Sequence, residues 1–270
     1  MQQILNECRW LYNHFLEQRE TAWEERQESF SLYDQIKMLP ALKKERPSLN
    51  IVHSQVLQNV AVRIDLAFKA FFRRVKSGEK PGYPRFKGYG WYDSFTYPQV
   101  GFALKDNSVY LSKVGDVKAV IHRPVQGNFK TCCVKRSSAG KWHVTFTCEV
   151  EEQMLPESTE SVGIDVGLTA FAAFSNGEDP IPPPRFFRTD EKALARAQRR
   201  LSKEAKGTPA RGKRRKIVAH IHERIANRRS NFTHQASRRI VNRYGVIAVE
   251  DLNVNRMMHN HCLAKSIADA

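Results

Sequence analysis

The spacing of hydrophobic residues predicts a helical region at the start of the chain. Apolar side chains recur every three or four positions over residues 3–30 and again over 57–75, the pattern of two amphipathic helices. A serine–glycine pair ending at Gly78 predicts the end of the second helix. Pro40 and Pro47 predict an interruption between the two.

The middle of the chain changes to a β pattern. Residues 91–150 contain short apolar runs separated by turn residues such as Asn107 and Gly140. Val144 and Phe146 alternate with polar neighbours, which indicates a half-buried strand. We therefore expect a small antiparallel β-barrel or sandwich here. The polar, acidic stretch 151–161 that follows is expected to be a linker.

The last part of the chain combines strands with long helices. Residues 162–175 predict two strands, and 246–249 predict a short, fully apolar strand. Between them, the patterns over 189–205 and 213–244 predict two long helices joined by a basic loop. Thr189 is the expected N-cap of the first of these helices, with Asp190 in its first turn. Together these patterns predict a multidomain α+β protein.

Composition narrows the class of protein. Of 270 residues, 41% are hydrophobic, which is enough to form cores and argues against wholesale disorder. No apolar run approaches the length of a membrane helix, and the first ten residues lack the apolar stretch of a secretory signal. The five cysteines form no C-x-x-C pair, which argues against a disulfide framework. We expect a cytoplasmic protein.

Positive charge is concentrated in one block of the chain. Residues 185–245 hold 19 basic and 4 acidic side chains, a net charge of 19 − 4 = +15 out of +16 for the whole chain. The positive charges of so dense a block repel one another unless a polyanion neutralises them. Guanidinium groups also match the geometry of phosphate. Both points favour DNA or RNA as a partner. The alternative is a solvated helical face that only keeps the protein soluble. The expected phosphate contacts are Arg199, Arg200, Arg214, Arg215, Arg228 and Arg229.

A second candidate contact lies between the helical and β-rich regions. Residues 80–88 mix basic and aromatic side chains, and their prolines exclude a helix. Such a strap can lay rings and cations against bases and phosphates, through Tyr83, Arg85 and Lys87. A rigid linker whose aromatic side chains pack locally explains the same composition.

Two carboxylates carry the candidate chemistry. Asp165 lies in an apolar strand just before Gly167, and Glu250 follows the apolar run 246–249. Carboxylates brought together from adjacent strands form a hard oxygen site for Mg²⁺, the metal that assists phosphodiester hydrolysis in many nucleases. Each signal alone is weak, because the first pattern also occurs in ordinary turns and the second in helix N-caps.

The order of these motifs resembles the OrfB/TnpB transposon-encoded family, whose members are related to the type V CRISPR effectors. The resemblance implies a helical recognition region over 1–88, a wedge-like β-barrel over 89–157 and an RNase H-like (RuvC-type) nuclease domain over 158–270. The matching segments are Cys8–Asn13, Pro81–Lys87, Gly163–Leu168, Asn227–His234, Val249–Val254 and Ala264–Asp269.

This resemblance also implies a function. Members are RNA-guided DNA endonucleases that hold a transposon-derived guide RNA, use Mg²⁺ and support transposon maintenance, with a transposase of the same element as a further partner. By the resemblance, Asp165 is the first catalytic acid and Glu250 the second.

The chain departs from the family pattern at both ends. The family's opening strand, its four-cysteine zinc ribbon and its third catalytic acid are absent, and Asp269 belongs to the helix that precedes the ribbon. We therefore expect an incomplete RNase H-like domain, no zinc and a weakened Mg²⁺ site, so that the chain binds nucleic acid but cleaves it poorly or not at all. Two alternatives are a truncated RNA- or DNA-binding module without catalysis, and a basic architectural protein in which Asp165 and Glu250 are only structural.

Overall fold

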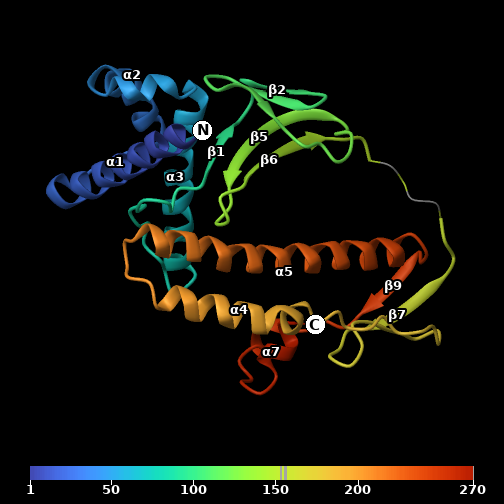
Figure 1. Ribbon diagram of the computed structural model, residues 1–270. Helices are drawn as coiled ribbons and strands as arrows, with labels where there is room; N and C mark the ends of the chain where they lie inside the picture. The colour runs from blue at the N-terminus through green and yellow to red at the C-terminus, as the bar shows by residue number, and fades with distance from the viewer. Residues whose placement is uncertain (153, 155–156, 270) are drawn as a thin grey trace. The chain divides into compact units, whose positions relative to one another are not determined.

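Figure 1 shows the computed structural model, which describes residues 1–152, 154 and 157–269. The chain divides into two compact units. The first comprises Met1–Ser137 and Lys141–Glu151, and the second comprises Ser138–Gly140 and the chain from Glu152 onward. Residues 153, 155 and 156 of the expected linker lie outside the described residues. Within the described part of the chain, none of the helices has the length and apolar composition of a membrane span.

The first unit opens with three α-helices. The predicted helices are confirmed, and Ser77 is the C-cap of α3. The expected break at Pro40 was wrong, because α2 runs through this proline. Proline costs the helix one hydrogen bond, and the burial of Leu39 and Leu42 in the core offsets that loss. The elements are α1 (Gln2–Arg26), α2 (Leu32–Glu45), the 3₁₀ turn η1 (Pro47–Ile51) and α3 (Ser54–Lys76).

Two three-stranded antiparallel sheets follow. One has the order β1-β5-β6 and the other β2-β3-β4, so the predicted antiparallel strands are confirmed. The expected barrel was wrong, since no ladder joins the two sheets among the described residues and neither closes. The strands are β1 (Ser94–Tyr97), β2 (Phe102–Lys105), β3 (Ser108–Leu111), β4 (Gly115–Lys118), β5 (Asn128–Arg136) and β6 (Trp142–Glu149).

Helices and sheets of the first unit share one core. Phe15 and Ile64 from the helices lie in the same buried cluster as Phe95 from β1. Arg63 of α3 adds polar links to β1, because its guanidinium donates to the Ser94 carbonyl oxygen at 2.8 Å and to the hydroxyl of Thr96 at 2.9 Å. Helices α1 and α3 thus pack against β1. The division of this part of the chain into a recognition region over 1–88 and a wedge region over 89–157 stays a prediction.

The second unit joins a small sheet to a helical hairpin. Its sheet has the order β8-β7-β9, with β7 antiparallel to β8 and parallel to β9. Helices α4 and α5 pack side by side (Figure 1). The predicted strand at 246–249 is confirmed as β9, which is a sheet edge with Val246 64% and Val249 66% exposed. The elements are β7 (Ser161–Asp165), β8 (Ala173–Phe174), α4 (Phe186–Ser202), α5 (Pro209–Val241), β9 (Val246–Val249), α6 (Val254–Met257) and α7 (Ala264–Ile267).

Candidate nucleic-acid interface and acidic pair

Asp165 and Glu250 lie at the same edge of the small sheet. Asp165 is the last residue of β7, and Glu250 directly follows β9. The two strands run parallel, with Ile164 opposite Val249, so the next position on each strand carries one of the two acids. Both residues are exposed. The structure therefore brings the two predicted acids to neighbouring strand ends, where solvent and ligands reach them.

The start of β9 is fixed by contacts around Tyr244, and this placement determines where Glu250 lies. The Tyr244 hydroxyl donates to the Glu178 carboxylate and accepts from the Asn176 amide at 2.9 Å. Hydrogen bonds from the Tyr244 hydroxyl and the Asn176 amide hold the pKa of the Glu178 carboxyl below its usual range. The next residue, Gly245, donates its N–H to the Glu160 carbonyl oxygen at 3.0 Å. A side chain at Gly245 would meet the Ser158 carbonyl oxygen at 1.9 Å, so only glycine fits this approach.

The donor set at this edge suits a hard cation. Carboxylate oxygens are the ligands that Mg²⁺ prefers, and Mg²⁺ is commonly held by one or two carboxylates together with substrate phosphates and water. Among the described residues, no group of three or more His, Cys, Asp and Glu side chains lies together. Asp165 and Glu250 are thus the carboxylates that could hold a cation at this edge, and their role as metal ligands stays a prediction.

The basic block forms the hairpin of α4 and α5. Helix α5 has 33 residues, which corresponds to about 50 Å of helix. Thr208 caps it, as its hydroxyl accepts the Arg211 N–H at 3.2 Å. Ile225 and Ala236 are buried on one side of α5, as their spacing predicts. The same spacing predicts that Ile217 faces inward, which was wrong, because this side chain is 45% exposed. The arginines consequently cover a long, exposed helical surface.

Asp190 links the two helices of the hairpin. Its buried carboxylate accepts from Nε of Arg224 at 3.1 Å and lies 3.6 Å from Nη1 of Arg228. The sequence placed Asp190 in the first turn of a helix capped by Thr189. That prediction was wrong, because α4 begins at Phe186 and Asp269 caps it from the far end of the chain. Asp190 therefore neutralises arginines of α5 instead of marking a helix start.

The six candidate arginines divide into paired and unpaired groups. Arg214 Nε lies 3.5 Å from a Glu204 carboxylate oxygen, and Arg229 Nη2 lies 3.8 Å from Asp269 Oδ1. Arg228 faces Asp190, as described above. Arg199, Arg200 and Arg215 are exposed and have no acidic partner among the contacts of the described residues. These last three are the arginines best placed to meet an added anion.

A cavity of about 220 Å³ opens between the two helices. Arg196 and Arg200 of α4 line it together with Arg214 of α5, and Ile217 contributes apolar lining. Guanidinium groups from both helices thus converge over an apolar floor, a setting in which charge-assisted hydrogen bonds to phosphate are strong.

The strap over residues 80–88 is anchored to the helices of the first unit. Tyr83 packs edge-on against Phe68 and Phe71 at 5.6 and 5.3 Å between ring centroids. The backbone of Lys87 exchanges two hydrogen bonds with the Asn13 side chain, at 2.7 and 3.0 Å. Tyr83 is nevertheless 45% exposed, and Arg85 points to solvent. Local packing therefore explains the backbone of the strap, and its role in nucleic-acid contact stays a prediction.

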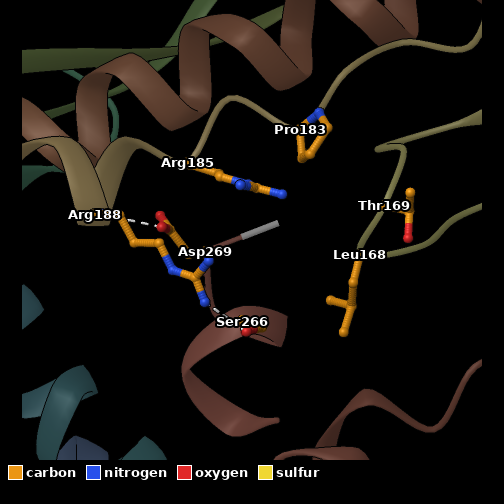
Figure 2. Close-up of a pocket in the computed structure, with 7 residues that line it drawn as sticks. All are labelled: Leu168, Thr169, Pro183, Arg185, Arg188, Ser266 and Asp269. Carbon is orange, nitrogen blue, oxygen red and sulfur yellow. Dashed lines mark hydrogen bonds between the residues drawn. The ribbon is translucent and has the colours of Figure 1, made fainter.

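Sequence reasoning missed a cluster at the start of α4. Asp269 is buried and lies beyond α7 rather than inside that helix as expected. With Arg185 and Arg188 it lines a cavity that also includes Thr169 and Ser266 (Figure 2). These residues are up to 100 positions apart in the sequence and follow no shared pattern, so only the fold brings them together.

Comparisons with known proteins identify the family of this chain. The family model OrfB_IS605, described as "Probable transposase", matches residues 145–261. A "Putative RNA-guided DNA endonuclease" of Streptomyces pristinaespiralis is 34% identical over 268 residues, covering 97% of this chain and 65% of that protein. The "Putative RNA-guided DNA endonuclease InsQ" of Escherichia coli (strain K12) is 32% identical over 206 residues, covering 76% of this chain and 50% of that protein. The chain belongs to the OrfB/TnpB family.

The chain spans 65% and 50% of the length of these two relatives of the OrfB/TnpB family. Among solved structures, a chain of the "Cryo-EM structure of CRISPR-Cas12f Ternary Complex" is similar over 93% of this chain and 62% of that chain, with 16% identity and a TM-score of 0.36. This score is too low to define the fold.

Proposed function

We propose that this OrfB/TnpB chain is part of an RNA-guided DNA endonuclease in which Asp165 and Glu250 are two of the catalytic acids. The observation that carries the proposal is the register of β7 and β9, which leads both acids to one sheet edge of a strongly basic protein. The names of its two relatives support the same activity.

The sheet of the second unit supports an RNase H-like, RuvC-type domain. A strand antiparallel to β7 on one side and a strand parallel to it on the other match that fold as far as three strands allow. The helical region would then serve recognition, and the β-rich region would serve as the wedge. A cytoplasmic location and a transposase of the same element as partner belong to this proposal as well.

Mg²⁺ would be held by the carboxylates of Asp165 and Glu250, and when bound it activates water and stabilises the leaving oxygen of a phosphodiester. The chain's own residues bind and orient the nucleic acid. The unpaired Arg199, Arg200 and Arg215 would contact backbone phosphates, which positions a strand without reading its sequence. Base pairing with a guide RNA would supply the sequence specificity.

Metal binding tests the acidic pair directly. Mn²⁺ replaces Mg²⁺ at oxygen sites and is observed by electron paramagnetic resonance, so it can be titrated into the wild-type chain, Asp165→Asn and Glu250→Gln. We expect each substitution to weaken Mn²⁺ binding more than about tenfold, a loss typical of removing a group that supports a metal ion. Asp179→Asn, an exposed acid of the same unit, is the matched control and should leave binding unchanged.

Two results would contradict the proposal. The first is equal Mn²⁺ binding by the wild type, Asp165→Asn and Glu250→Gln. The second is that the chain carries no RNA when it is purified from cells that transcribe the neighbouring transposon end. Measurable DNA cleavage by the 270-residue chain with its guide would correct the expectation of weak activity, and loss of that cleavage in Asp165→Ala would assign it to this pair.

A further inference from the structure

The cavity at the start of α4 has two guanidinium groups on its wall. Its volume is about 220 Å³, and it lies between the loop after β7, the first turn of α4 and the segment after α7. Figure 2 shows Arg185 and Arg188 reaching into it from one side and Thr169 from the other. Ser266 and Asp269 complete its polar lining.

Asp269 is engaged by other groups and does not neutralise both arginines. Its carboxylate accepts the N–H groups of Phe187 at 2.6 Å and of Arg188 at 3.1 Å, which caps α4. Nη2 of Arg229 lies 3.8 Å from the same carboxylate. The helix terminus is therefore already satisfied, and the single carboxylate, which also faces Arg229, leaves the cavity with net positive charge from the two guanidinium groups.

The two arginines are held differently. Nη2 of Arg188 donates to the Ser266 hydroxyl at 2.7 Å, which fixes this guanidinium at the wall. The Arg185 side chain has no hydrogen bond or ion pair among the contacts of the described residues, and it is exposed. Its backbone is left-handed, with φ 47°, a conformation that costs an arginine roughly 1 kcal/mol. Strained residues of this kind concentrate at ligand sites.

We propose that this cavity binds a backbone phosphate of the nucleic acid, with Arg185 and Arg188 as its clamp. The inference rests on the proposed function, because it takes the phosphate to be that of a bound strand. Two planar guanidinium groups offer paired donors that match phosphate oxygens, and the hydroxyl of Thr169 adds a further donor.

Chain connectivity relates this phosphate to the acidic pair. Thr169 is four residues after Asp165, so their Cα atoms lie at most about 15 Å apart. A strand held in the cavity is thereby kept close to the edge where Asp165 and Glu250 lie. Arg185 and Arg188 are positioning residues in this role, since they hold the strand without touching the reacting atoms.

Binding of a 20-nucleotide single-stranded DNA by the full chain tests the clamp. Arg185→Gln removes one charge from the cavity, and Lys192→Gln removes one exposed charge from the same helix outside it. We expect Arg185→Gln to weaken binding about tenfold and to lower the magnitude of the salt slope by about 0.7, one phosphate contact of a single strand. Lys192→Gln should change the dissociation constant less than about twofold, the range of a solvated charge. Arg185→Lys keeps the charge, so it should preserve the salt slope but recover only part of the affinity, because an ammonium lacks the paired donors of a guanidinium.

A second variant separates the cavity from general surface charge. Thr169→Trp fills the cavity without changing its charge and should weaken binding as Arg185→Gln does, with circular dichroism used to verify folding. The source of the phosphate is tested by phenylglyoxal, which modifies arginine. DNA should slow modification of Arg185 in the wild type, and inorganic phosphate should do so only at much higher concentration.

The outcomes distinguish this inference from the function on which it rests. If the wild type binds no nucleic acid, both fail. If it binds and Arg185→Gln equals Lys192→Gln, the clamp alone is overturned. Protection of Arg185 by inorganic phosphate but not by DNA also overturns it, because the cavity would then hold a free anion.

Discussion

Asp190 is the residue on which the helical hairpin depends. Its buried carboxylate faces Arg224 and Arg228 across the helix interface, while both guanidinium groups stay about half exposed. Removing it leaves two cations without their partner next to a small cavity. Solvent screens the exposed guanidinium groups, so the cost falls below that of a fully buried pair.

We expect Asp190→Ala to lower the free energy of unfolding of the second unit by about 1–2 kcal/mol, the range of lost hydrogen bonds to charged groups. Urea denaturation followed by circular dichroism measures the change. Glu191→Gln removes the exposed ion pair with Lys265 and should cost less than about 1 kcal/mol. Equal effects of the two substitutions would show that the Asp190 pairing adds no stability.

Glu7 gives the first unit a pH-dependent contact. Burial raises the pKa of this carboxyl, but hydrogen bonds from Arg46 and Ser48 outweigh burial, so its pKa is lower than usual. A carboxyl whose pKa is depressed in the folded state binds a proton more readily in the unfolded chain. Its stabilisation is therefore complete above the unfolded value near 4.5 and is lost as pH falls through the folded value.

We expect Glu7→Gln to be less stable than the wild type at pH 7, with the difference shrinking below pH about 4.5. Thermal unfolding of both proteins between pH 7 and pH 3 measures it. A gap that stays constant over that range would mean that the carboxylate charge contributes nothing.

Individual residue roles were only partly predictable. Asp165 and Glu250 could be found because each ends an apolar run, a local pattern. Asp269 and Arg185 could not, because the first caps a helix 80 residues away and the second matters through its backbone conformation. Contacts of that kind depend on tertiary packing, which hydrophobic periodicity does not encode.

The entry to β9 depends on one glycine. A Cβ at Gly245 would lie 1.9 Å from the Ser158 carbonyl oxygen, so the backbone must move to admit it. Any such shift moves β9 against β7 and displaces Glu250 from Asp165.

We expect Gly245→Ala to destabilise the second unit by about 1–3 kcal/mol, the cost of overpacking, and to weaken Mn²⁺ binding. Gly212 in α5 is the matched control, since nothing lies within 4 Å of its Cβ position and alanine favours helix. Gly212→Ala should be neutral or stabilising. Denaturation and Mn²⁺ titration measure both variants, and equal behaviour would contradict the role given to Gly245.

The positions of helices and strands were easier to predict than whether the sheets close into a barrel. Helices α1 and α3 and the strands of residues 91–150 follow directly from period and turn residues. The passage of α2 through Pro40 and the open sheets do not follow from these patterns. The first depends on the burial of Leu39 and Leu42, and the second on which distant strands pair. Local propensity determines where a strand forms, whereas closure requires hydrogen bonds between strands distant in sequence.

The charge of the whole molecule governs how it meets nucleic acid. Of the net +16, one block contributes +15 through the hairpin of α4 and α5. Arg200 and Arg215 have no acidic partner among the described residues, unlike Arg228, which faces Asp190. Unpaired guanidinium groups release counterions from DNA without first breaking an ion pair.

We expect the double variant Arg200→Gln/Arg215→Gln to lower the magnitude of the salt slope for duplex DNA by about 1.8, or about 0.9 per phosphate contact. Binding constants between about 50 and 200 mM salt measure the slope. A double variant of Lys118→Gln and Lys130→Gln in the first unit removes the same charge and is the control. An unchanged slope in the arginine variant would exclude these two side chains as phosphate contacts.

Strand β9 leaves one flank of its backbone without a neighbour among the described strands, and the apolar side chains of Val246 and Val249 face solvent beside it. Unprotected edges of this kind recruit extended polypeptide, because the free N–H and C=O groups form a ready ladder. Preparations of this chain should therefore scatter light increasingly as concentration rises, unless some extended segment occupies that flank first.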